Sequence, residues 1–320
     1  MSSRRVLHPL FTQLGTALAD GGRGLEALAG ADPVDWRDLL LTLSAIHDLH
    51  TAPLGELGGR ERFQHHPAVA DVKWRLEQTL VAELVRRDET AGWHLPEQPS
   101  AAMRAIAVRG LVPDIYQWLA DDAGRQEIVE FLSLEGGPDG GFDDLVAACQ
   151  IGLDGTAKLE LAQNYWDEMG NGSLARVHTE LHRKLSRALG LSCPPRDRQP
   201  VEALERSVLT GLLATNRSLQ PEMLGALGLL ELQAGPRCRR VVAALGRIGA
   251  GEDALDFYVE HAHVDPRHGK DWVDKAVAPF DDDPRWGGGI ARGARWRSIV
   301  NAGFFDAMAD SFLHEERRAS

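Results

Sequence analysis

The chain has 320 residues, 43% of them hydrophobic, which suits one large or two small globular domains. Its formal charge is −12 and its basic residues are dispersed, which excludes a nucleic-acid partner. No apolar run reaches the length of a membrane span, no signal-peptide pattern occurs, and the three widely spaced cysteines are typical of reduced thiols, so we expect a cytoplasmic protein without membrane attachment.

Residues 1–60 are predicted to form an N-terminal helical extension, and residues 61–320 the main domain. The extension has one clear helix, at 33–50, between glycine-rich stretches. Helices over 68–87, 100–109 and 113–119 open the main domain, since apolar residues recur there at helical spacing. No alternating strand pattern or internal repeat occurs, so the expected fold class is all-α.

The helix expected at 125–135 is the first with a candidate ligand. Ile128, Phe131 and Glu135 share its apolar face, whereas Glu130 faces the other way. Of the local acids, Glu135 is therefore the metal candidate.

Two helices expected at 156–169 and 174–189 are separated by Gly170 and Gly172. Glu168 lies near the end of the first, and His178 faces inward on the second. The glycine break lets the two side chains converge from different directions.

A helix at 201–215 is followed by a strongly apolar helix that begins near Pro221 and carries Glu231 at the end of its apolar run. An uncompensated carboxylate there would be protonated or cost several kcal/mol, so a cation is the economical explanation. Residues 237–248 are expected to form a separate helix.

The segment at 257–272 places His261, Asp265 and His268 at positions i, i+4 and i+7 of a helix. The three side chains therefore point the same way, into the apolar interior, and such a set suits a transition metal. Pro266 lies among them and predicts a kink or a loosened turn. A glycine-rich turn at 287–289 and a last helix to residue 312 complete the chain.

These helices present seven inward imidazole or carboxylate side chains: Glu135, Glu168, His178, Glu231, His261, Asp265 and His268. The four carboxylates among them offset two divalent cations, and seven ligands are too many for one mononuclear site. Ligation without thiolate favours iron or manganese over structural zinc.

The chain resembles the haem-oxygenase-like diiron oxidases and oxygenases, also called iron-containing redox enzymes. DEMGNG-x5-H, with Glu168 and His178, carries the resemblance, together with Glu231 upstream of HAHVDPRH, with His261, Asp265 and His268. An earlier helical glutamate completes the family pattern; Glu135 matches it best, and Glu130 is the alternative. The resemblance covers roughly residues 65–315.

The resemblance implies a seven-helix all-α bundle without haem that binds two Fe(II) ions and uses O₂ as cosubstrate. Family members oxidise small molecules by N-oxygenation, desaturation or oxidative C–C cleavage, and one iron tends to be held weakly. An electron donor and a homodimer are compatible with this expectation. The alternatives are a metal-free helical module of the same fold that binds a small molecule or a partner, and a fatty-acid oxidative decarboxylase.

The favoured substrate is an amino acid or a small amine derived from one. Arg292 and Arg295 open the last helix, where a guanidinium would clamp a substrate carboxylate. Tyr165 and Tyr258 are candidate catalytic residues, and Trp166 is a candidate substrate contact.

Overall fold

A computed structural model describes residues 9–136 and 141–319, with side chains up to residue 312. Across these residues the chain has thirteen α-helices and no β-strand, which confirms the all-α prediction. Residues 1–8, 137–140 and 320 lie outside the described part, and so does the beginning of the N-terminal stretch in which no signal peptide is expected.

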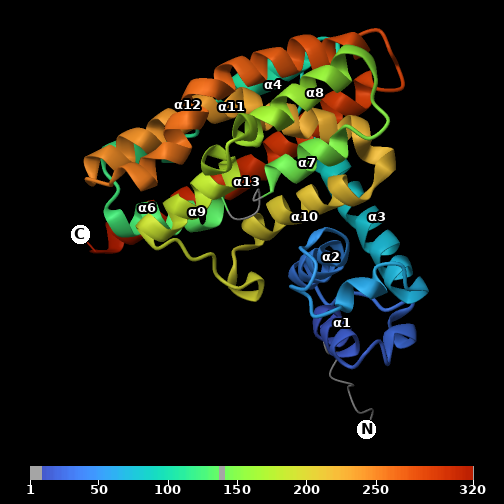
Figure 1. Ribbon diagram of the computed structural model, residues 1–320. Coiled ribbons are helices and arrows are strands. Elements are labelled where there is room, and N and C mark those ends of the chain that lie inside the picture. Colours follow the sequence, from blue (N-terminus) through green and yellow to red (C-terminus); the bar gives the residue numbers. More distant parts are fainter. Residues whose placement is uncertain (1–8, 137–140, 320) are drawn as a thin grey trace.

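The N-terminal part consists of α1 (Leu10–Ala19), α2 (Trp36–Thr51) and α3 (Pro67–Thr90). Helices α1 and α2 lie at one end of the molecule in Figure 1. The sequence did not predict α1. The backbone amides of Leu10 and Phe11 donate to the Asp38 carboxylate of α2 at 2.8 and 2.9 Å, so an acid from a neighbouring helix stabilises its first turn.

The bundle comprises ten further helices among the described residues: α4 (Pro99–Arg109), α5 (Asp114–Asp121), α6 (Arg125–Glu135), α7 (Phe142–Cys149), α8 (Gly155–Glu168), α9 (His178–Leu189), α10 (Val201–Thr215), α11 (Gln220–Arg247), α12 (Glu252–Asp271) and α13 (Gly287–Ala319). The predicted bounds of α6 and α10 coincide with the observed ones, and α7 was not predicted. Within the described residues, no helix combines the length and the apolar character needed to cross a membrane.

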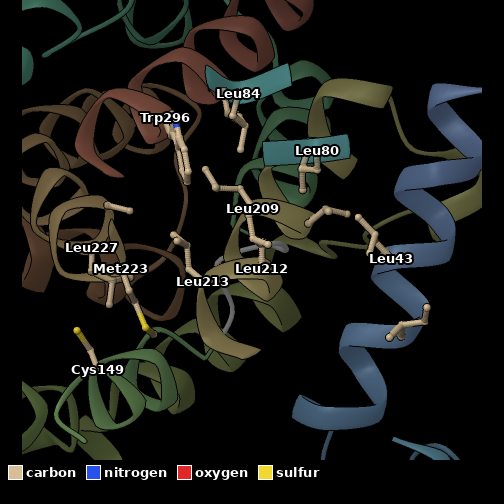
Figure 2. Close-up of a cluster of buried hydrophobic side chains, with 14 of the residues drawn as sticks. Leu43, Leu80, Leu84, Cys149, Leu209, Leu212, Leu213, Met223, Leu227 and Trp296 are labelled. Carbon is tan, nitrogen blue, oxygen red and sulfur yellow. The ribbon is translucent and has the colours of Figure 1, made fainter. Parts of the chain in front are cut away.

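The N-terminal part packs on the bundle through α10. Figure 2 shows Leu43 of α2 facing the same hydrophobic cluster as Leu80 of α3 and Leu209 of α10. A Cβ atom on Gly211 would overlap the His47 ring, so this glycine lets α2 lie close to α10. The residues assigned to the extension thus share one buried core with the main domain.

Helix α11 runs without interruption where two helices were predicted. It passes through Gly235 and Pro236, which lie at the expected boundary between the two. Pro236 removes one backbone hydrogen bond, but buried residues on both sides of it pack against α12 and α13. Tertiary packing therefore outweighs the local preference to end the helix.

Glycines 287–289 begin α13, although a turn was predicted there. A Cβ atom on Gly293 of α13 would overlap the Glu222 carbonyl group, and one on Gly225 of α11 would overlap the Ile290 carbonyl group. The glycines on these two helices thus allow their backbones to cross in direct contact.

Helix α12 is continuous through Pro266, where a kink or loosened turn was expected. The departure from α-helical hydrogen bonding comes after its end, in a π-helical turn at Trp272–Val277.

Candidate metal centre

The connection between α8 and α9 brings Glu168 next to His178. Gly170 has φ of +60°, and a Cβ atom there would overlap the Arg176 backbone. Asn171 follows with φ of +53°, in the left-handed region that asparagine tolerates. The chain reverses direction, and Oε2 of Glu168 lies 2.7 Å from Nδ1 of His178.

Helices α11 and α12 approach closely at the level of the other candidate ligands. A Cβ atom on Gly269 would lie 2.8 Å from the Cα atom of Leu232, so no side chain separates the two backbones there. As a result Glu231 of α11 faces α12, and Nδ1 of His268 lies 3.8 Å from an oxygen of Glu231 and 3.8 Å from one of Asp265.

Among the described residues, the possible donor atoms form two groups that share Glu168. The first group is Glu168, His178 and His261, and the second is Glu168, Glu231 and His268. Within each group the donor atoms lie within 4.8 Å of one another. Ligands at about 2.0–2.2 Å from one ion are at most about 4.4 Å apart, so each group needs only a small adjustment to hold an ion. Asp265, which is 2% exposed, adjoins the second group.

Hydrogen bonds orient three of these side chains. Nδ1 of His261 lies 2.6 Å from the Phe257 carbonyl oxygen and donates to it, which leaves Nε2 as the lone-pair nitrogen. Nε2 of His268 lies 3.0 Å from Asp167 Oδ2, which leaves Nδ1 facing the carboxylates. Asn164 donates to Glu231 at 2.7 Å. Such partners fix the tautomer and direction of metal ligands.

Burial and mutual repulsion disfavour charge on the carboxylates of the second group. Burial, with the nearby Glu168 carboxylate, raises the pKa of Glu231 to about 7. Burial and the Glu231 and Glu168 carboxylates raise the pKa of Asp265 well above its ordinary range. A cation between these groups would remove the repulsion.

The first group shows the opposite balance. Burial alone would raise the pKa of Glu168, but the adjacent His178 outweighs it and the pKa is lowered. Burial and the neighbouring His178 lower the pKa of His261 to about 4, so its imidazole is neutral, the form that binds metals.

The residues fit bound iron. Nδ1 of His268 and Oδ2 of Asp265 are buried atoms without a hydrogen-bond partner among the described residues, and Nδ1 of His178 faces the Glu168 carboxylate at 2.7 Å. Buried polar atoms are normally satisfied, and bound metal would satisfy those of His268 and Asp265. The donor set is nitrogen and oxygen without thiolate, which suits iron.

Glu135, the seventh predicted ligand, lies apart from both groups. It lines the same cavity, of about 350 Å³, but its Oε1 accepts a hydrogen bond of 3.0 Å from the Tyr116 hydroxyl. The alternative, Glu130, is exposed on the other face of α6.

Of the predicted aromatic site residues, the structure places Tyr258 in the cavity wall. Trp166 is half exposed and covers Gly172. Tyr165 packs against the main hydrophobic cluster. Neither is among the described residues that line the cavity.

The two arginines predicted to clamp a carboxylate lie elsewhere. Arg292 pairs with Glu222, and Arg295 pairs with Asp88 through two bonds of 2.7 Å. Among the described residues, neither is in the cavity wall, because the face of α13 that carries them packs against α11 and α3.

Sequence reasoning missed Asp167, Arg206 and Arg237 at the site. Asp167 precedes a predicted ligand and faces away from the apolar stripe, so no periodic signal marks it. Arg237 had a signal: on a continuous α11 it follows Leu230 and Ala234 on one apolar face, where a charged residue is unusual.

A model of the family described as iron-containing redox enzymes matches residues 129–301, which is more than half of the chain and includes both donor groups. No curated protein matches the chain. The resemblance inferred from the sequence is thereby confirmed, and the chain belongs to the iron-containing redox enzymes and is an oxidoreductase.

Proposed function

We propose that the chain is a non-haem diiron oxidase or oxygenase in which Glu168 would serve as a ligand in both of two Fe(II) sites. His178 and His261 would complete the first site, and Glu231, His268 and Asp265 would complete the second. The observation that carries this proposal is the sharing of Glu168 between two groups of donors, which are buried except for the partly buried His261.

Ferrous iron bound there would supply the electrons for reaction with O₂, which organic side chains cannot provide. The protein's own contribution is orientation and exclusion of water. Asp167 and the Phe257 carbonyl oxygen hold two imidazoles in register. Leu230 and Phe257 cover the adjoining cavity with apolar surface.

Tyr258 is the side chain proposed to contact substrate. It is buried in the cavity wall, and burial raises the pKa of its hydroxyl well above its ordinary range. The hydroxyl therefore stays protonated and is available to donate a hydrogen bond to a bound molecule.

The proposed substrate is an amino acid or a small amine derivative, oxidised by N-oxygenation, desaturation or oxidative C–C cleavage. A cavity of about 350 Å³ is at the small end of ligand sites, and its wall contains acidic, basic and hydroxyl groups. Both features support a small polar substrate over a long apolar chain.

Anaerobic Fe(II) titration tests the metal assignment. We expect two equivalents in the wild type, one each in His261→Gln and His268→Gln, and fewer in Glu168→Gln, because only Glu168 serves both groups. Glu130→Gln is the control, since this exposed glutamate should leave both irons in place. A wild type that binds no second iron, or a Glu168→Gln variant that still binds two, contradicts the proposal.

Oxygen uptake by the iron-loaded protein tests the reaction. We expect uptake to be stimulated by an amino acid or amine and to be lost in His261→Gln. Stimulation by fatty acids alone would overturn the substrate assignment and leave the diiron assignment standing.

A further inference from the structure

The cavity beside the metal centre also contains an acid that belongs to neither donor group. Asp143, in the first turn of α7, lines the cavity together with Glu168 and His178. The two groups of possible metal donors do not include it. Iron held by those groups would therefore leave the charge of Asp143 without a counter-ion.

Asp143 lies on the inward side of its helix. It precedes the fully buried Val146 by three residues, so the two side chains share one face of α7. Asp144, in the same first turn, is exposed, whereas Asp143 is partly buried. The dipole of a helix favours an acid in its first turn, and the exposed Asp144 is sufficient for that purpose. An acid on the inward face needs a further explanation.

One oxygen of Asp143 is left without a partner. Its Oδ1 is buried and has no hydrogen-bond partner among the described residues. Burial and the neighbouring Asp144 and Glu168 carboxylates raise the pKa of Asp143, although the backbone amides of Asp143 and Asp144 oppose this effect. The side-chain charges that act on this carboxylate are thus negative. A cation beside it would offset both the burial and the repulsion.

The arginines of the cavity wall do not supply that cation. Arg183, Arg206 and Arg237 line the same cavity. Arg183 pairs with a glutamate of its own helix, and the other two donate to backbone carbonyl oxygens at 2.9 and 3.1 Å. Among the described residues, no ion pair joins any of the three to Asp143. The counter-charge of Asp143 is therefore expected to come from a bound molecule.

We propose that Asp143 binds the cationic nitrogen of the substrate and makes the cavity selective for a protonated amine. An ammonium group has three donors and no acceptor, so it can donate to Oδ1 and supply the counter-charge together. The carboxylate of a fatty acid would instead bring a further negative charge to a wall that already holds Asp143 and Glu168. This inference deepens the proposed function, and it rests on that function for the presence of a substrate in the cavity.

Anaerobic isothermal titration calorimetry on metal-free and Fe(II)-loaded protein tests the inference. The probes are L-norleucine, L-methionine and L-tyrosine, each with its decarboxylated amine and with the carboxylic acid that lacks its α-amino group. L-Lysine and cadaverine extend the series to a second ammonium group. We expect at least one ammonium compound to bind, and the acid of the same carbon skeleton to bind about 10- to 100-fold more weakly, which is the usual effect of losing a charged hydrogen-bonded group.

Three variants test the role of the residue itself. Asp143→Asn should weaken the tightest ammonium compound about 10- to 100-fold without weakening the acids. Asp143→Glu keeps the charge and should keep the preference for amines over acids. Asp144→Asn is the matched control, because it removes the adjacent acid of the same helical turn from the exposed face, and it should change neither affinity.

Thermal unfolding and anaerobic Fe(II) titration accompany each variant. We expect Asp143→Asn to be folded and to take up as much iron as the wild type, since Asp143 is in neither donor group. If Asp143→Asn does not fold, the comparison of amines with acids in the wild-type protein and in Asp143→Glu decides the matter.

The inference is overturned if no ammonium compound binds, if the acids bind as tightly as the amines, or if folded Asp143→Asn keeps the wild-type affinity for the amine. An equal loss in Asp144→Asn, or a loss of iron in Asp143→Asn, would overturn it as well. Uptake of two irons without amine binding would leave the diiron proposal standing. Amine binding that depends on Asp143 in a protein unable to take up two irons would overturn the diiron proposal and leave the amine site in place.

Discussion

Replacing Gly269 by alanine should separate α11 from α12 at the metal centre. The added Cβ atom would lie 2.8 Å from the Leu232 Cα atom and 2.9 Å from the Glu231 carbonyl oxygen. Carbon atoms in contact are about 3.5–4.0 Å apart, so the helices must part by roughly 1 Å. Both obstructing atoms belong to backbone and cannot rotate away.

Two effects of this separation are measurable. Overpacking of this kind costs about 1–3 kcal/mol, against a helix-propensity gain of about 1 kcal/mol for alanine, so the free energy of unfolding should fall by up to about 2 kcal/mol. Metal–ligand distances stay within about 0.2 Å of their usual values, and a shift of roughly 1 Å between α11 and α12 exceeds this, so the affinity for the second iron, held by both helices, should fall.

Urea denaturation and anaerobic Fe(II) titration check both effects. The control is Gly246→Ala on α11, where a Cβ atom meets nothing within 4 Å and stability should rise by up to about 1 kcal/mol with both irons retained. If Gly269→Ala is as stable as the wild type and binds both irons with unchanged affinity, the close approach of α11 and α12 does not form the second site.

Three further predictions concern separate parts of the molecule. Asp167→Asn should weaken the second iron about 10- to 100-fold by releasing the bond to His268, measured by Fe(II) titration. Leu209→Ala, in the core of Figure 2, should lower the free energy of unfolding by about 2–5 kcal/mol in urea. Burial and the nearby Lys73 lower the pKa of His50 to about 4, so its contribution to stability should be present above its ordinary pKa of about 6.5 and be lost as the pH falls toward 4.

Each of these three predictions has an outcome that would contradict it, and the first also has a control variant. Asp121→Asn, an exposed acid, should leave iron affinity unchanged, and an equal affinity in Asp167→Asn would rule out its orienting role. For Leu209, a loss below about 1 kcal/mol would contradict close packing between α10 and its neighbours. For His50, thermal unfolding at pH 7.5 and 4.5 should show a smaller pH effect in His50→Gln than in the wild type; equal effects would contradict the assignment.

Most helices were predictable from the sequence, because the spacing of apolar residues along a helix is a local property. The bounds of α6 and α10 were obtained in this way, and so was the inward direction of the candidate ligands on α9, α11 and α12. The reversal at Gly170 was predictable too, since Gly170 and Gly172 both adopt the positive φ that glycine tolerates best.

The wrong predictions of helix ends and turns concern glycines whose presence is explained by contact with a neighbouring helix. Gly235 and Pro236 look like a helix end, and Gly287 to Gly289 look like a turn, but in the folded chain Gly235 makes room for Pro266 of α12, and Gly289 makes room for Pro221 of α11. Glycine has the same local signature in a turn and in a close helix crossing, so spacing alone could not separate the two.

The periodicity of each helix also identified the candidate ligands, but it did not identify which of them lie next to one another. A helical face shows which side chains point inward, and it says nothing of which inward side chains meet. Only the tertiary structure decided that Glu168 is common to two donor groups, that Glu135 stands apart beside Tyr116, and that Arg237 replaces Arg292 and Arg295 in the cavity wall. These depend on the distances between α6, α8, α11 and α12, which are set by packing between helices and leave no mark on the sequence of any one of them.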